Sequence, residues 1–182
     1  MAMPPPLRKV ALTAHVAFSV GWLGAVAGFL ALAIAGLTSS DAQVVRGAYV
    51  AMEVIGWFVL VPFSLASLLT GLIQALGTTW GLVRHYWVLF KFLISVVATV
   101  LLLVHMQVAG HVADAAAASS LSGGDLKGMR IQLLADAGAA LLVLLVAVAL
   151  SVYKPRGLTR YGWHRQREQA QQRGGTQPTP VS

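Results

Sequence analysis

The chain has 182 residues, of which 57% are hydrophobic and only 10% are charged, and this composition excludes a soluble globular protein of this size. The net charge of +7 does not indicate nucleic-acid binding, because the basic residues lie at segment ends and in the C-terminal tail. The absence of cysteine excludes disulfides and cysteine-ligated metals, so any metal would be bound by His, Met, Lys or carboxylate side chains.

Apolar runs predict an all-α integral membrane four-helix bundle. Each run has about the 20 residues or more that a membrane-spanning helix needs. The expected helices cover residues 10–37, 48–76, 85–110 and 131–153. Pro62 predicts a kink in the second helix. The spans form one domain, residues 1–155, followed by a basic tail, residues 156–182, which has no apolar period and is expected to be disordered.

The basic residues predict that both termini are cytoplasmic. In that orientation, the cytoplasmic segments hold ten of them: Arg8, Lys9, Arg84, Lys91, Lys154, Arg156, Arg160, Arg165, Arg167 and Arg173. The outer loops hold only Arg46, Lys127 and Arg130. We therefore expect a multi-pass protein of a bacterial plasma (inner) membrane, with a flexible outer loop over residues 112–128.

A small-residue motif in the first helix indicates close helix packing. Gly24 and Gly28 form a GxxxG pair, which lets another helix backbone approach closely. We interpret the pair as packing within the bundle, and the alternative is a homodimer seam in which a second copy of the chain is the partner.

Two nitrogen donors are expected at matching depth in the first and third helices. His15 lies six residues beyond Lys9, and Lys91 lies seven beyond Arg84, so both sit about 10 Å past their flanking charges. Ionisable side chains inside a span are costly and are therefore functional candidates. The alternatives are a snorkelling lysine and a histidine bonded to a neighbouring carbonyl or serine.

A second polar set lies in the outer half. Glu53 of the second helix is expected to pair with His105 of the third, because a buried carboxylate needs a partner. His111 and Asp136 lie on the same side of the membrane. We interpret this set as a structural hydrogen-bonded pair rather than a metal site.

The first and third helices resemble those of a known group of small membrane proteins. The first reads AHVAFSVGWLG, with Trp22 seven residues after His15, and the third opens with WVLFK, with Trp87 four residues before Lys91. This pairing is similar to the HemJ-type protoporphyrinogen oxidases and, more distantly, to the CopD-type copper-resistance domains. The resemblance implies haem b, bound through His15 and Lys91 with Trp22 and Trp87 nearby. The arginine-containing segment that HemJ-type sequences carry after this tryptophan is absent, so the resemblance implies haem binding more than oxidase activity.

Two functional hypotheses follow from the sequence. In the first, the protein binds haem between the first and third helices and has redox activity. His15 is then the iron ligand, and Lys91 is a second ligand or the partner of a propionate. In the second, the protein is a noncatalytic membrane accessory or assembly protein, whose polar side chains only fix helix register. The sequence leaves open whether the protein is an enzyme.

Overall fold

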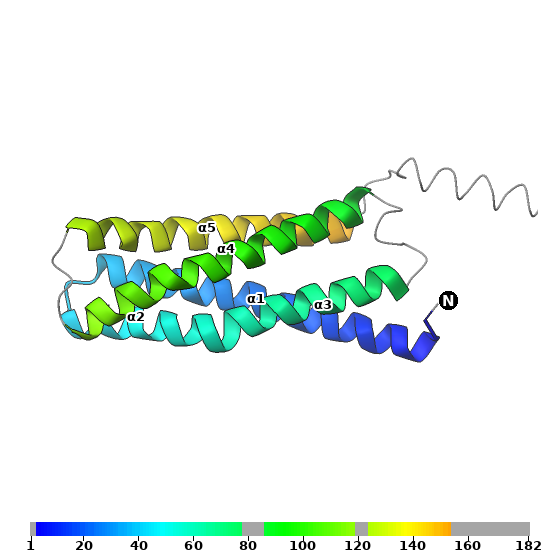
Figure 1. The fold of residues 1–182 in the computed structure, drawn as a ribbon, viewed down its shortest axis with the longest axis horizontal. Coiled ribbons are helices and arrows are strands. Elements are labelled where there is room, and N and C mark those ends of the chain that lie inside the picture. Colours follow the sequence, from blue (N-terminus) through cyan, green and yellow to red (C-terminus); the bar gives the residue numbers. More distant parts are fainter. Residues whose placement is uncertain (1–2, 78–85, 119–123, 154–182) are drawn as a thin grey trace, which may run out of the picture.

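The computed structural model describes residues 3–77, 86–118 and 124–153. All regular structure in these residues is helical, and four stretches are long and apolar enough to cross a membrane (Figure 1). The elements are α1 (Pro5–Thr38), α2 (Ala42–Ile55), the π-helix η1 (Gly56–Leu60), α3 (Val61–Gly77), α4 (Tyr86–Ala117) and α5 (Gly124–Tyr153). Because α2, η1 and α3 follow one another without a break, they form a single span. The prediction of a helical multi-pass membrane protein is confirmed, whereas the predicted tail lies outside the described residues.

The helix α4 is longer than predicted, in a segment where alanine dominates. The expected loop over residues 112–128 is too long, because α4 continues to Ala117 and α5 already begins at Gly124. Alanine has the highest helix propensity, and Val112, Ala113 and Ala116 are almost completely buried. Packing and propensity therefore both extend the helix past the apolar run.

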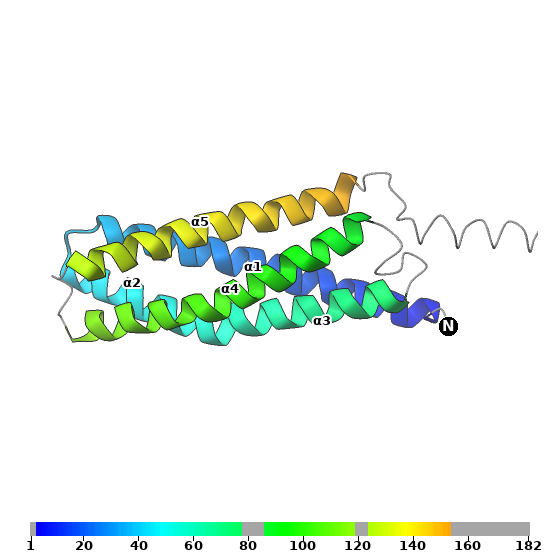
Figure 2. The same cartoon turned by 45° about the horizontal axis from the view of Figure 1, so that its top comes forward.

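The four spans form an up-and-down bundle in which α1 and α4 lie on a diagonal (Figures 1 and 2). Each of these two helices packs against the span formed by α2, η1 and α3 on one side and against α5 on the other. We call the end where α1 begins the N-terminal end and the opposite end the far end. The first and third predicted helices, which carry His15 and Lys91, are thus separated by neighbours rather than packed face to face.

The apolar core occupies the far half of the bundle. Its largest fully buried side chains include those of Tyr49, Met52, Leu60, Met106 and Leu133. In the N-terminal half, by contrast, no described residue is buried in the segments 3–21 of α1, 88–98 of α4 and 145–153 of α5. The far half therefore carries most of the buried apolar side chains, whereas the buried residues described in the N-terminal half are few: Ser64, Ser67, Ala75, Thr99 and Leu144.

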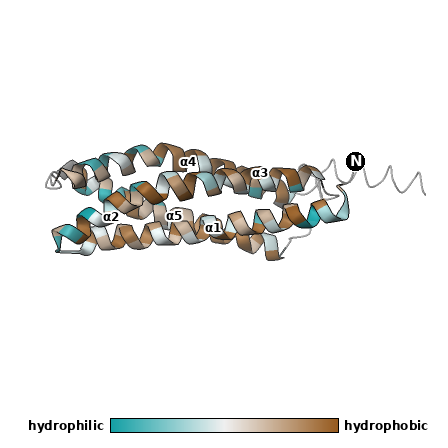
Figure 3. Cartoon of the chain, turned by 90° about the horizontal axis from the view of Figure 1, so that it is seen from below, coloured by the Kyte–Doolittle hydropathy of each residue, from teal (hydrophilic) through white to brown (hydrophobic). Residues whose placement is uncertain are grey.

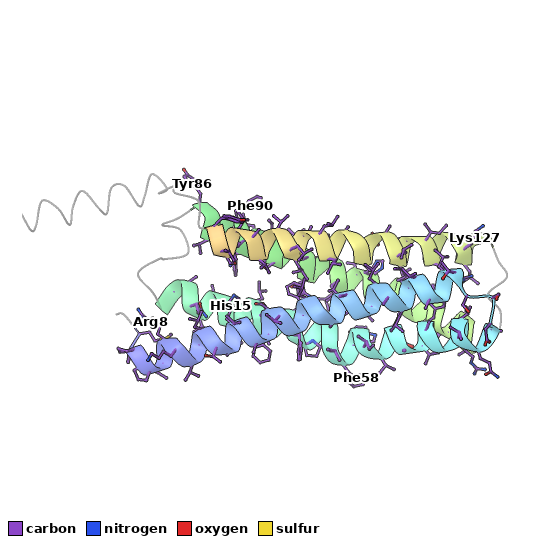
Figure 4. The ribbon with its side chains drawn as sticks, turned by 180° about the vertical axis from the view of Figure 1, so that it is seen from behind. Arg8, His15, Phe58, Tyr86, Phe90 and Lys127 are labelled. Atoms are coloured by element: carbon purple, nitrogen blue, oxygen red, sulfur yellow. The ribbon has the colours of Figure 1, made fainter. Side chains whose placement is uncertain are left out.

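The outer surface of the bundle is apolar along its length. Figure 3 shows hydrophobic colouring over the helices, with hydrophilic colouring gathered toward the two ends. Phe58 is 77% exposed and points away from the bundle (Figure 4). Exposed side chains of this kind are expected to face lipid, since a water-exposed apolar surface of this extent would be unstable.

The π-helix η1 accommodates the proline of the second span. Pro62 has no N–H to donate, and its ring would clash with the carbonyl of the preceding turn in a regular helix. The chain widens by one residue over Gly56–Leu60, where the N–H of Val61 bonds the carbonyl of Gly56. The predicted irregularity near Pro62 is thus present as a π-bulge. Gly56 is buried, and a Cβ there would collide with the side chain of Met106 on α4.

An arginine ties three helices together at the far end, in a group we call the Arg130 clamp (Arg130, Tyr49 and Gly36). Arg130 of α5 donates through Nε to the hydroxyl of Tyr49 on α2 at 2.9 Å, and through Nη2 to the carbonyl of Gly36 on α1 at 2.6 Å. Its guanidinium carbon also lies 5.3 Å from the centre of the Tyr49 ring. A Cβ on Gly36 would lie 2.8 Å from this ring, so only glycine fits without displacing it.

The GxxxG pair of α1 does not serve packing inside the chain. A Cβ placed on Gly24 or on Gly28 would meet nothing within 4 Å, and both residues are exposed. Our interpretation of the pair as packing within the bundle is therefore wrong, because the face of α1 that carries it points outward.

Candidate functional site

His15 lies in the N-terminal half of α1 and turns toward α3 (Figure 4). Its Nδ1 is 3.1 Å from the carbonyl oxygen of Ser67 and 3.2 Å from the hydroxyl of Thr70. A carbonyl oxygen can only accept, so Nδ1 must carry the proton and donate it. The lone pair of His15 is then on Nε2, which makes no hydrogen bond with the described residues. The structure therefore leaves one ring nitrogen free to bind a ligand.

A glycine on α3 makes space for this imidazole. A Cβ on Gly71 would lie 3.0 Å from Cε1 and 3.4 Å from Nδ1 of His15. With a larger side chain at this position, the imidazole would have to shift by a few tenths of an ångström. The ring orientation is thus fixed by Gly71 and Ser67 together.

The contact between α1 and α3 is lined by polar groups, which we call the α1/α3 polar seam. The hydroxyls of Ser19 and Ser67 are 2.8 Å apart, and Nε2 of Gln74 donates to the carbonyl of Ala11 at 2.9 Å. The α3 side of the seam consists of Ser64, Ser67, Thr70 and Gln74. This spacing of three and four residues places all four on one helical face, a signal present in the sequence that we did not use.

Lys91 lies on α4, near the N-terminal end, and turns toward α5. Its Nζ donates to the hydroxyl of Ser151 at 2.6 Å, and this hydroxyl donates to the carbonyl of Ala147 at 2.8 Å. The lysine is half-buried and close enough to His15 to interact with it electrostatically. His15 and Lys91 therefore share one region of the bundle, but they are hydrogen-bonded to different helices.

The two tryptophans have different positions. Trp22 is buried and packs in the apolar core with Val26 and Phe29. Trp87 begins α4, and its side chain lies outside the described part of the structure.

The predicted pair of Glu53 and His105 is wrong, because His105 pairs with Asp136 of α5. Its Nδ1 lies 2.8 Å from Oδ2 of Asp136. The face of α4 that approaches α2 is the one with Met106 and Gly110, four residues apart, and His105 projects from the face toward α5. The carboxylate of Glu53 accordingly reaches Gly110, with 3.6 Å between Oε1 and a Cβ placed on that glycine.

The described residues contain no group of three or more His, Cys, Asp or Glu side chains that could hold a metal ion. A metal bound mainly by protein side chains is thus not indicated in residues 3–77, 86–118 and 124–153. A haem iron needs only one or two protein ligands. No family model, curated protein or solved structure matches this chain.

Proposed function

We propose that the protein is a haem-binding integral membrane protein in which His15 is an axial ligand of haem b. One observation carries the proposal: Nδ1 of His15 is held as a donor to the Ser67 carbonyl, and the lone pair of Nε2 is available. A histidine that binds a metal almost always donates its other N–H to a carbonyl or carboxylate, which fixes the tautomer and the direction of the ligating nitrogen.

Two further features of the surroundings of His15 support the proposal of a bound haem. The N-terminal half of the bundle lacks the dense apolar core of the far half, so a large planar ligand would displace little buried side-chain volume. Lys91 supplies a cation in the same region, suited to pair with a propionate. The resemblance of the first and third spans to HemJ-type proteins supports the same assignment. When bound, a haem supplies one-electron redox chemistry, and the proposal extends to such activity.

The second candidate is a noncatalytic accessory or assembly protein. The bonds between Ser19 and Ser67 and between His15 and Ser67 favour it, because both join α1 to α3 and would fix the register of these helices without any cofactor.

The visible spectrum of the purified full-length protein separates the two candidates. After expression with an ample haem supply, the haem proposal predicts a Soret band together with the sharp bands of a reduced b-type haem. A stable but colourless protein would favour the second candidate and contradict the first.

Lys91→Met is expected to leave haem bound but to weaken its retention about tenfold, since the variant loses a cation and not the histidine ligand. Haem release to an excess of apomyoglobin measures this retention. Lys127→Met, which removes an exposed cation at the far end, is the control. Equal release rates in the two variants would exclude a role for Lys91.

We also propose that both termini face the cytoplasm of a bacterial cell, from the split of ten basic residues against three. Fusions of a periplasmic enzyme reporter after Gly123 and after Gln177 should then be active only at Gly123. Activity at both positions, or at neither, would contradict the four-span topology.

The exposed GxxxG face of α1 supports a homodimer. Gly24 and Gly28 have open space around them within the chain, so the close approach that they permit is left for a second copy. Gly28→Leu is expected to shift the protein from dimer to monomer in light scattering of detergent-solubilised samples, with unchanged thermal stability of the chain. Gly47→Leu, also at an open position, is the control. A wild-type protein that is already monomeric would contradict the dimer.

A further inference from the structure

Three ionisable side chains lie at similar depth on three helices of the far half. Glu53 is eleven residues after Ala42 on α2, His105 is twelve before Ala117 on α4, and Asp136 is twelve after Gly124 on α5. At about 1.5 Å per residue, each lies about 16–18 Å from the far end of its helix. Such groups are rare inside membrane spans and therefore indicate a use, and two of the three, His105 and Asp136, form a pair.

The pair of His105 and Asp136 connects the outside of the bundle with its interior. The side chain of Asp136 is 48% exposed and that of His105 only 14%. Nδ1 of His105 is paired with Oδ2 of Asp136, whereas Nε2 is enclosed and has no hydrogen-bond partner in the described part of the chain. One nitrogen of the ring thus faces a carboxylate at the surface of the bundle, and the other faces the interior.

Each protonation state of this pair carries one cost. With a neutral ring donating through Nδ1, the negative charge of Asp136 has no compensating positive charge in the pair. With a protonated ring the charges balance, but the N–H at Nε2 then lacks an acceptor. Because neither state is free of cost, a single proton can change the state of the pair.

Few other charges face the pair, and Arg130, six residues before Asp136 on α5, is bonded to Tyr49 and to the carbonyl of Gly36. Glu53 approaches α4 from α2 at Gly110, about one turn farther out than His105, and makes no hydrogen bond or ion pair with the described residues. Neither η1 nor α3 carries a titratable side chain, and α1 does not pack closely on α4. His111 and Asp114 are exposed and lie farther out on α4.

We infer that His105 and Asp136 form a proton-exchange site that takes up a proton and holds it inside the bundle. The proton binds the lone pair of Nε2, which turns the imidazole into imidazolium, and the carboxylate of Asp136 balances the new charge. No other bond is formed or broken. The site lies in the opposite half of the bundle from His15 and does not depend on haem.

Nitrogen NMR of the full-length protein in lipid vesicles tests this site. With ¹⁵N-labelled histidine, the Nε2 signal of His105, assigned as the one missing in His105→Gln, is followed from about pH 8 to about pH 5. We expect it to change from the unprotonated to the protonated shift in the wild type. In Asp136→Asn we expect the change to move by at least one pH unit or to disappear, because the balancing charge is lost. Asp114→Asn should titrate like the wild type.

Two results would overturn the inference. The first is a wild-type His105 whose nitrogen shifts stay constant over the whole pH range, as expected for a static contact. The second is a titration that is identical in the wild type and in Asp136→Asn. Asp136→Glu keeps the carboxylate and should restore proton uptake, which separates loss of the proton site from misfolding of the asparagine variant.

Discussion

Gly36→Val is expected to lower the free energy of unfolding by about 3 kcal/mol, the largest stability effect that we expect from one substitution. A Cβ at this position would lie 2.8 Å from Cζ and 2.9 Å from Cε2 of Tyr49, whose side chain is almost completely buried. The ring cannot move without breaking its bond to Arg130, because the guanidinium also holds the carbonyl of Gly36. Overpacking typically costs 1–3 kcal/mol, and hydrogen bonds to a charged group add to that.

Thermal unfolding in detergent, followed by circular dichroism, measures this effect. Gly47→Val is the matched control, because a Cβ at Gly47 meets nothing within 4 Å and the change in helix propensity is the same. We expect a clearly lower midpoint for the Gly36 variant only. Equal midpoints would show that the Arg130 clamp contributes little to the bundle.

His15→Ala is expected to abolish haem retention, which is the largest functional effect. The substitution removes the one ring nitrogen that we assign to the iron and leaves the carbonyl of Ser67 and the hydroxyl of Thr70 without the imidazole as a partner. His111→Ala is the matched control, since His111 is exposed and, within the described part of the chain, is bonded to the carbonyl of Gln107 in its own helix. The absorbance ratio of the Soret band to protein, measured after purification, should fall to background in the first variant and stay at the wild-type value in the second.

Gly71 offers a second approach to the same claim, because it positions the ligand without touching the iron. A larger residue there would shift the His15 ring away from α3 and lengthen the bond from its Nδ1 to the Ser67 carbonyl. The haem proposal therefore expects Gly71→Val to weaken haem retention about tenfold, as found for groups that orient metal ligands. Unchanged retention would show that the orientation of His15 in the bundle is not the one that a haem uses.

The spans could be predicted from the sequence because they depend on local composition. Runs of about 20 apolar residues predict membrane spans. Pro62 predicted an irregularity in the second span, and the structure shows that it is a π-bulge. The ends of the helices were less predictable. The alanine-rich segment that follows Val112 lies past the apolar run, yet propensity and burial keep it helical up to Ala117.

The partners of the polar side chains could not be predicted, because they depend on which helices become neighbours. The depth of His105 in the membrane was compatible with Glu53 as its partner. The packing of α4 against α5 brings His105 to Asp136 instead. Lys91 and Ser151 are 60 residues apart in the chain, and no local pattern links them. Nothing in the sequence around Gly71 indicates that the imidazole of His15 packs against it.

A haem titration of the full-length protein in lipid nanodiscs tests the central claim most directly. The protein is purified without haem, and the Soret absorbance is followed as haem is added to the wild type and to His15→Ala. We predict a sharp end point at one haem per chain for the wild type and a gradual, unsaturated rise for the variant. A titration without an end point in the wild type, or the same end point in both proteins, would contradict a haem site at His15.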